Sequence, residues 1–244
     1  MRELTKKELE LIGGGWETGG IVVTGGDDGD WGDWGDWGDW GDDYGDDTVD
    51  GGGGGGGDSP PPPPDPCDNQ TEAEQEKDEA IDIANDINAQ NPVDPVTGAA
   101  LEQGALIYRD PVTGAIERTP VASGTPGNVS VTAPAGVGAD DIVGFVHTHP
   151  TAPSTGNPTL DAQLAAADRY PSPGDWDQMD ALVAGGADPN ALTFYIIDAA
   201  GQMREYDYTD KAIYDVPATD LMGQTGTPPP LPPAMDLTAA TCPA

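Results

Sequence analysis

The only two histidines of the 244-residue chain lie two positions apart, as His147 and His149, with Thr148 between them and Pro150 behind. On an extended segment, residues i and i+2 point to the same face, so both imidazoles can reach one point. Neutral imidazole is a common zinc ligand, and a catalytic zinc site combines three protein ligands with an open position for water. The pair therefore indicates part of a zinc site, and two structural histidines at a strand end are the alternative.

A third ligand is available downstream, where Ser172 precedes Asp175 by three positions. Serine, then proline at the first helical position, then an acid in the first turn is also the pattern that begins a helix, and it resembles a capping box. The two roles are compatible, because an acid in the first turn can point one oxygen outward. Asp175 is therefore a candidate third ligand, and Asp161 and Asp168 are its competitors.

Together these residues resemble the signature of the JAMM (MPN-plus) metallopeptidases, in which His-Ser/Thr-His-Pro is followed by Ser-x-x-Asp and preceded by a glutamate. The resemblance covers about residues 102–208 and is greatest to the bacterial JAB-like domains of secreted and toxin-associated proteins. It implies zinc as the cofactor, with His147, His149 and Asp175 as ligands. It also implies that Ser172 helps to stabilise the oxyanion of the transition state and that Glu102 carries the proton of the attacking water.

Glu102 is the best match to the glutamate of this family, because the order Glu-Gln-Gly-Ala-Leu-Ile at the start of a strand is similar to the family's Glu-x-(x)-Gly-apolar stretch. Glu117 follows a turn and Glu205 lies late in the chain, so both are less well placed, and an ordinary surface glutamate is the alternative for Glu102. The 22 residues between His149 and Ser172 exceed the usual spacing of the family. They predict a loop and a short helix, an insertion that costs little because loop-closure entropy grows with the logarithm of length.

The elements that must position these residues belong to a segment of ordinary composition, residues 67–215. Its periodicities indicate strands mixed with helices and a hairpin near each end, which favours an α+β fold over a doubly wound parallel sheet. The JAMM resemblance implies a single JAB/MPN-like domain, with a mixed, mainly antiparallel sheet flanked by helices. The predicted helices are residues 71–90, 158–170 and 173–183, and the predicted strands are residues 104–109, 115–118, 128–133, 141–147, 192–197 and 202–208.

Composition restricts the partners and the domain organisation. There are 44 acidic residues against 9 basic ones, a net charge of −35, which disfavours binding to nucleic acid or to anionic membrane surfaces. No apolar run approaches the roughly 18 residues of a membrane span, so no membrane insertion is expected.

Residues 16–66 contain four Gly-Asp-Trp triplets and runs of glycine and proline, which predict a disordered linker, with calcium binding or adhesion through tryptophan as alternatives. Residues 216–244 predict a Pro-rich tail.

Residues 1–15 resemble the double-glycine leader of bacteriocins and related bacterial peptides, with Leu4, Leu9 and Ile12 on one stripe ahead of Gly14 and Gly15. The resemblance implies cleavage after Gly15 by the cysteine-peptidase domain of an ABC exporter. It therefore implies a secreted bacterial protein. An amphipathic helix ended by glycine is the alternative, because glycine is a common residue at helix C-termini.

The only two cysteines, Cys67 and Cys242, bracket the segment of ordinary composition. In an oxidising compartment they can pair and join its two ends, and two free thiols are the alternative. The expected function is zinc-dependent hydrolysis of a peptide or isopeptide bond in a peptide or protein substrate. A non-catalytic binding module of JAB fold and a bacteriocin-like exported toxin are the alternatives from other classes.

Overall fold

The computed structural model describes residues 66–151, 154–239 and 241–242. The predicted leader, with Gly14 and Gly15, and residues 16–65 of the predicted linker lie outside the described residues. Cys67 and Cys242 are disulfide-bonded, and since the chain has no other cysteine they are joined to each other.

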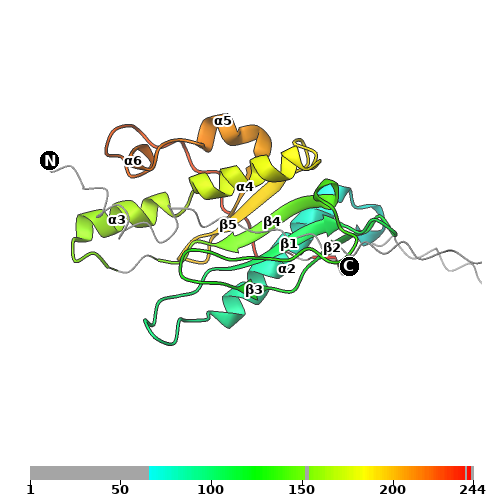
Figure 1. Ribbon diagram of the computed structural model, residues 1–244, viewed down its shortest axis with the longest axis horizontal. Helices are drawn as coiled ribbons and strands as arrows, with labels where there is room; N and C mark the ends of the chain where they lie inside the picture. Colours follow the sequence, from blue (N-terminus) through cyan, green and yellow to red (C-terminus); the bar gives the residue numbers. More distant parts are fainter. Residues whose placement is uncertain (1–65, 152–153, 240, 243–244) are drawn as a thin grey trace, which may run out of the picture. The chain divides into compact units, whose positions relative to one another are not determined.

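In the described part of the chain six strands form one sheet, namely β1 (Gln103–Arg109), β2 (Ile116–Arg118), β3 (Ala122–Ser123), β4 (Ile142–Thr148), β5 (Thr193–Ile197) and β6 (Met203–Asp207). The order is β2-β1-β4-β5-β6, with β3 paired to β1 (Figure 1). All neighbouring strands are antiparallel except β4 and β5, which are parallel. The predicted α+β class with a mainly antiparallel sheet is confirmed.

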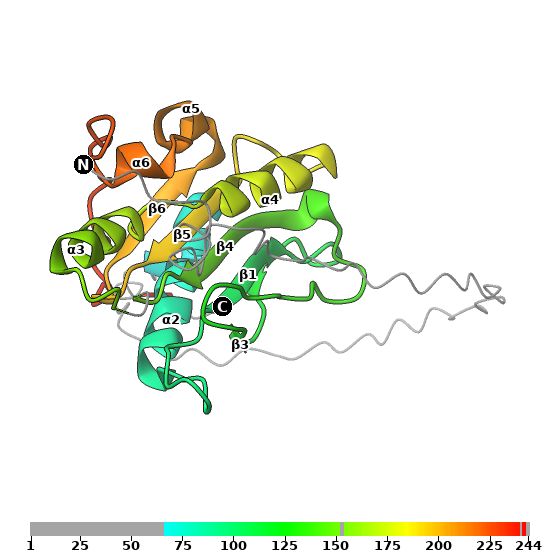
Figure 2. The ribbon, with the colours of Figure 1, turned by 60° about the vertical axis from the view of Figure 1, so that its left-hand side comes forward.

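Helices cover both faces of this sheet (Figures 1 and 2). On one face lies α2 (Glu72–Gln90), and on the other lie α3 (Pro158–Ala167), α4 (Pro173–Ala184), α5 (Lys211–Tyr214) and α6 (Ala218–Leu221). Each face has its own hydrophobic core, because successive side chains of a strand alternate between them: Phe145 packs under α4 and Val146 under α2. Three short 3-10 helices complete the described elements, η1 (Pro66–Asn69), η2 (Ala139–Asp141) and η3 (Tyr208–Asp210).

The long helix α2 begins and ends where its sequence indicates. Thr71 is the N-cap, and its backbone N–H donates to the carboxylate of Glu74 at 2.7 Å in a capping box. Asn91 ends the helix in the left-handed conformation, at φ 41°. One stripe of the helix is apolar and buried, and it consists of Ala80, Ile81, Ala84 and Ile87. None of the helices in the described ranges combines the length and the apolar composition needed to cross a bilayer.

The strand predicted over residues 128–133 is not formed. Val129, Val131 and Ala133 are buried, as the alternation indicates. In the described structure, however, this segment takes part in no strand ladder beyond an isolated bridge between Thr125 and Asn128. The prediction was wrong because alternation reports which side chains are buried, and not whether a neighbouring strand is there to pair with the backbone.

The pentapeptide Asp-Pro-Val-Thr-Gly occurs twice, at residues 94–98 and 110–114, and folds in the same way each time. In both copies the aspartate carboxylate accepts the N–H groups two and three positions further on, at 2.7–2.8 Å. Both closing glycines have positive φ, 71° and 75°, which glycine adopts without strain. The two loops precede and follow β1, so they set where that strand enters and leaves the sheet.

The segment after residue 215 packs on the same domain. Leu221 and Met222 are buried in the core on the α3/α4 face. Further on, the N–H of Met235 donates to the carbonyl of Met203 at 2.9 Å, on the edge strand β6. This segment therefore satisfies part of the edge of β6, which would otherwise be open to pairing with another chain.

Glu76 of α2 is a buried acid on the face away from the histidine pair. Its carboxylate accepts the hydroxyl of Tyr195 at 3.0 Å and is 7% exposed. Burial raises the pKa of Glu76 to about 8, and the charges of Glu205 and Asp207 raise it further, against hydrogen bonds from Tyr195 and Thr193 that lower it. The folded protein thus favours the protonated form of this side chain.

We expect Glu76 to make the free energy of unfolding fall as the pH rises from its ordinary pKa of 4.5 to about 8. In that window the unfolded chain has released the proton and the folded chain still holds it, so rising pH favours unfolding. Glu76→Gln removes this pH dependence. The free energy of unfolding of the variant should be roughly 2–4 kcal/mol higher than that of wild type at pH 8 and equal to it near pH 4. Urea unfolding of both proteins across this range measures the difference, and parallel pH profiles would contradict the prediction.

Candidate metal centre

Strand β4 brings both histidines to one end of the sheet. His147 lies in β4, opposite Gly104 of β1 and Ile196 of β5. His149 follows the strand, and its N–H extends the parallel pairing by donating to the carbonyl of Ile197 at 2.9 Å. The two rings lie on the same side of the extended backbone, with their Nε2 atoms 3.0 Å apart. The sequence spacing predicts this arrangement.

Strand β1 can approach His147 closely because residue 104 is glycine. A Cβ at Gly104 would lie 2.9 Å from the carbonyl oxygen of Val146 and 2.8 Å from the ring of Phe145, closer than van der Waals contact allows. A side chain here would therefore push β1 away from β4. Glu102, two residues earlier on the same segment, would move with it.

Helix α4 brings a carboxylate to the two histidines. Ser172 is the N-cap of α4, and its N–H donates to Oδ2 of Asp175 at 2.6 Å while its Oγ accepts the N–H of Asp175 at 3.3 Å, so the predicted capping box is formed. The same carboxylate lies 3.1 Å from Nε2 of His147 and 3.3 Å from Nε2 of His149. Trp176, fully buried, packs the first turn of α4 on the core. Asp175 therefore caps the helix and contacts both histidines at once.

The separations of these atoms suit a small tetrahedral metal ion. The two Nε2 atoms and the nearer oxygens of Asp175 are 3.0, 3.1 and 3.3 Å apart. Ligands bound at about 2.0–2.2 Å to a tetrahedral metal ion such as zinc lie about 3.3–3.6 Å from one another. The fold holds two imidazoles and one carboxylate at separations close to these, so the three side chains can bind a metal ion together.

Glu102 lies beside this group, immediately before β1. It is 8% exposed, so it is not the surface glutamate of the alternative interpretation. Its backbone is fixed on both sides, with its N–H donating to Thr125 at 2.9 Å and its carbonyl accepting from Gly124 at 2.8 Å. A carboxylate oxygen of Glu102 and one nitrogen each of His147 and His149 all lie within 4.8 Å of one another. These three residues form a buried group that can hold a metal ion.

The electrostatics of the group follow from burial and from Asp175. Burial disfavours ionisation of Asp175, but the charges and hydrogen bonds of the two histidines outweigh it and hold its pKa well below the usual range. Burial lowers the pKa of His147, whereas at His149 the contacts with Asp175 outweigh burial and raise the pKa to about 9. Burial also raises the pKa of Glu102 to about 8. The carboxyl groups and imidazoles of the group thus bind protons in the absence of a metal ion, and a divalent metal ion could replace those protons.

Among the described residues, the carboxylates of the competing acids form no ion pair with the two histidines. The carboxylate of Asp161 accepts the hydroxyl of Thr155 at 2.6 Å, and with Asp168 it lines a cavity of about 130 Å³. Burial raises the pKa of Asp168 to about 6. Glu117 is held by a tyrosine hydroxyl and Glu205 by a lysine, in contacts away from the histidines. Among the described residues, Asp175 is thus the aspartate in contact with both imidazoles.

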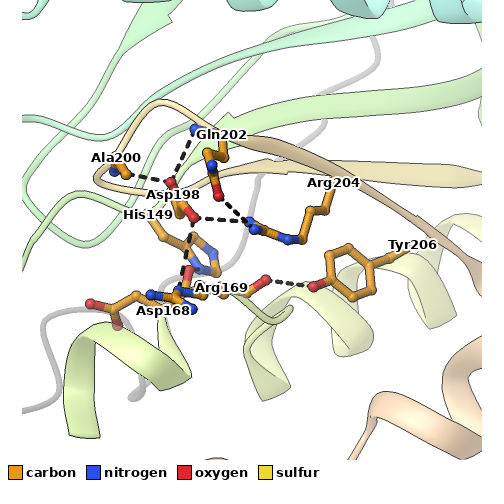
Figure 3. A network of polar contacts seen from close by, with 8 residues as sticks. All are labelled: His149, Asp168, Arg169, Asp198, Ala200, Gln202, Arg204 and Tyr206. Atoms are coloured by element: carbon orange, nitrogen blue, oxygen red, sulfur yellow. Dashed lines mark hydrogen bonds and ion pairs between the residues drawn. The ribbon is translucent and has the colours of Figure 1, made fainter. Parts of the chain in front are cut away.

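The ring of His149 has a second partner, on the connection between α3 and α4. Its Nδ1 lies 2.9 Å from the carbonyl oxygen of Asp168. Both residues are drawn in Figure 3. With Nδ1–H donating to this carbonyl, Nε2 is the nitrogen directed at Asp175 and His147, which is the usual arrangement for a ligating imidazole. Sequence reasoning missed this contact, because a backbone carbonyl belongs to every residue type. The insertion does contain the predicted short helix, α3, which ends at Ala167, before the predicted end at residue 170.

No protein-family model, curated protein or solved structure matches this chain. The class defined by fold and site is an α+β domain with a buried group of two histidines and a glutamate that can hold a metal ion.

Proposed function

We propose that this chain is a zinc-dependent peptidase or isopeptidase of the JAMM type. One observation carries the proposal: two imidazole nitrogens and a carboxylate converge at 3.0–3.3 Å, with a second carboxyl group beside them. His147, His149 and Asp175 are the ligands in this proposal. A centre of three ligands leaves an open position, as catalytic zinc sites do and structural sites do not.

Glu102 is the proposed proton carrier. Zinc, when bound, supplies a Lewis acid and lowers the pKa of water towards neutrality. The carboxyl group of Glu102 is buried beside both histidines, and the backbone bonds on either side of it restrict where it can point. A carboxylate so placed can accept a proton from the attacking water and return it to the leaving amine. This shuttle between nucleophile and leaving group is what amide hydrolysis requires.

Ser172 is the proposed oxyanion donor. Its Oγ accepts a hydrogen bond from the N–H of Asp175, so the hydroxyl proton remains available for donation. The residue is 6% exposed and adjoins the carboxylate that contacts both histidines, so the hydroxyl is held next to the proposed reaction centre. A preorganised donor of this kind stabilises the charge that develops on the carbonyl oxygen of the substrate.

The proposal is tested by cleavage of a peptide pool with the full-length chain. The zinc-loaded protein should generate new amino termini, detected by mass spectrometry after isotopic labelling of amines. A chelator should abolish this cleavage, and added zinc should restore it. If the protein binds zinc and yet cleaves neither the peptide pool nor isopeptide-linked conjugates, the non-catalytic binding module becomes the better assignment.

Export through a double-glycine leader belongs to the same proposal. A disulfide between Cys67 and Cys242 is compatible with an oxidising compartment, where such bonds persist. The partner for leader removal is the cysteine-peptidase domain of an ABC exporter. Secreted protein that retains residues 1–15, as measured by intact mass, would exclude this route.

A further inference from the structure

The two histidines of the centre are held in different ways. His147 is fully buried, with its ring centroid 5.1 Å from that of Phe145 and 6.0 Å from that of Phe194, so packing sets its orientation. The ring of His149 contacts His147 and Asp175 through Nε2, and on its other side Nδ1 is hydrogen-bonded to the carbonyl of Asp168. The direction of its Nε2 therefore depends also on where the α3–α4 connection lies.

Strand β6 fastens that connection at the next residue. The hydroxyl of Tyr206 donates to the carbonyl of Arg169 at 2.5 Å (Figure 3). Tyr206 is 0% exposed, and its ring packs edge to face on Tyr214 at 5.1 Å, so the hydroxyl has little freedom to move. The carbonyl of Asp168, which holds His149, is thus one peptide unit from a carbonyl that β6 holds.

A buried ion pair stabilises the hairpin that carries Tyr206. Asp198 accepts the N–H groups of Ala200 and Gln202 at 2.9 and 3.0 Å and Nη1 of Arg204 at 2.8 Å. The guanidinium of Arg169 lies near the same carboxylate, with its Nε 4.0 Å away. Figure 3 shows that these groups and Tyr206 lie on the side of the connection towards β5 and β6. The hairpin therefore contacts Arg169 at two points. Tyr206 binds the backbone carbonyl of Arg169, and Asp198 lies near its guanidinium.

We propose that Tyr206 is a positioning residue of the metal centre. Its hydroxyl fixes the carbonyl of Arg169, this places the neighbouring carbonyl of Asp168, and that carbonyl directs Nε2 of His149 towards Asp175. The predicted effect on zinc binding rests on the proposed function. The effect on the ring of His149 does not, because the hydrogen bonds involved are present without a metal.

The test compares Tyr206→Phe with Tyr214→Phe in the full-length chain. Both variants remove a tyrosine hydroxyl from one packed aromatic pair, but that of Tyr214 donates to Pro230, outside the connection. The chain contains only two histidines, so its imidazole N–H signals in NMR arise from two residues alone. In the metal-free protein, Tyr206→Phe should speed solvent exchange of the His149 Nδ1 proton by about tenfold or more, as expected for a lost buried hydrogen bond. Tyr214→Phe should leave this exchange unchanged.

Zinc affinity, measured by competition with a chelator, is the second readout. Tyr206→Phe should weaken binding about 10- to 100-fold, the usual range for partners that orient a ligand. Tyr214→Phe should stay near wild type. The exchange rate of each variant is measured at the same number of degrees below its own melting temperature. A loss of global stability is then not mistaken for a local effect at His149.

The outcomes separate the two proposals. Unchanged exchange in Tyr206→Phe, or equal acceleration in both variants, would overturn the positioning role. Faster exchange in Tyr206→Phe alone, in a protein that binds no zinc, would support the role of Tyr206 in placing His149 and would reject the zinc-dependent function.

Discussion

His149→Ala should reduce the zinc content of the purified full-length chain from about one ion per chain to background. The substitution removes Nε2 of His149, which lies 3.0 Å from Nε2 of His147 and 3.3 Å from the carboxylate of Asp175. Of the three proposed ligands, His147 and Asp175 remain, and two ligands are too few for a stable zinc site. Elemental analysis after dialysis against zinc-containing and then zinc-free buffer gives the stoichiometry.

Asp161→Asn is the matched control for this measurement. Asp161 lies in the insertion between His149 and Ser172, and the sequence left it as a competing ligand. Its carboxylate, however, accepts hydrogen bonds from the hydroxyl groups of Ser154 and Thr155. Zinc should therefore remain at about one ion per chain in this variant. Wild type without zinc after metal addition would mean that the histidine pair is structural, and retention of zinc by His149→Ala would place the metal elsewhere.

Glu102→Gln should abolish hydrolysis and leave zinc in place. Glutamine has nearly the shape of glutamate but cannot accept and return a proton, so the rate should fall by about 10²- to 10⁴-fold, the usual contribution of a general acid–base group. The zinc content should not change, because the proposed ligands are His147, His149 and Asp175. The measurements are initial rates on one cleaved substrate and zinc content of the same preparation.

The control for Glu102 is Glu117→Gln. Glu117 lies on β2 and accepts the hydroxyl of Tyr108, away from the histidines, so its loss should leave the rate within about twofold of wild type. Full activity of Glu102→Gln would rule out the shuttle. Loss of zinc in that variant would make Glu102 itself a ligand, a role that its position within 4.8 Å of both histidines also permits.

Local patterns predicted much of the fold. The helix over residues 71–90, the capping box at Ser172 and the β1–β2 and β5–β6 hairpins depend on interactions between residues a few positions apart. The segment 128–133 shows the limit of such patterns. Its alternating side chains are buried as expected, but a strand also needs a neighbour, and neighbours come from distant parts of the sequence.

The sequence by itself determined those features of the centre that depend on one short segment of chain. His147 and His149 share a face because extended backbone repeats every two residues, and Asp175 can cap a helix and point outward because of its place in the first turn. Only the tertiary structure decided which acids meet the histidines. Gly104 admits β1 against β4 and so brings in Glu102, and the packing of α4 on the sheet brings in Asp175 in place of Asp161 or Asp168. Those contacts join residues far apart in the chain, and the carbonyl that orients His149 has no residue type by which a sequence could reveal it.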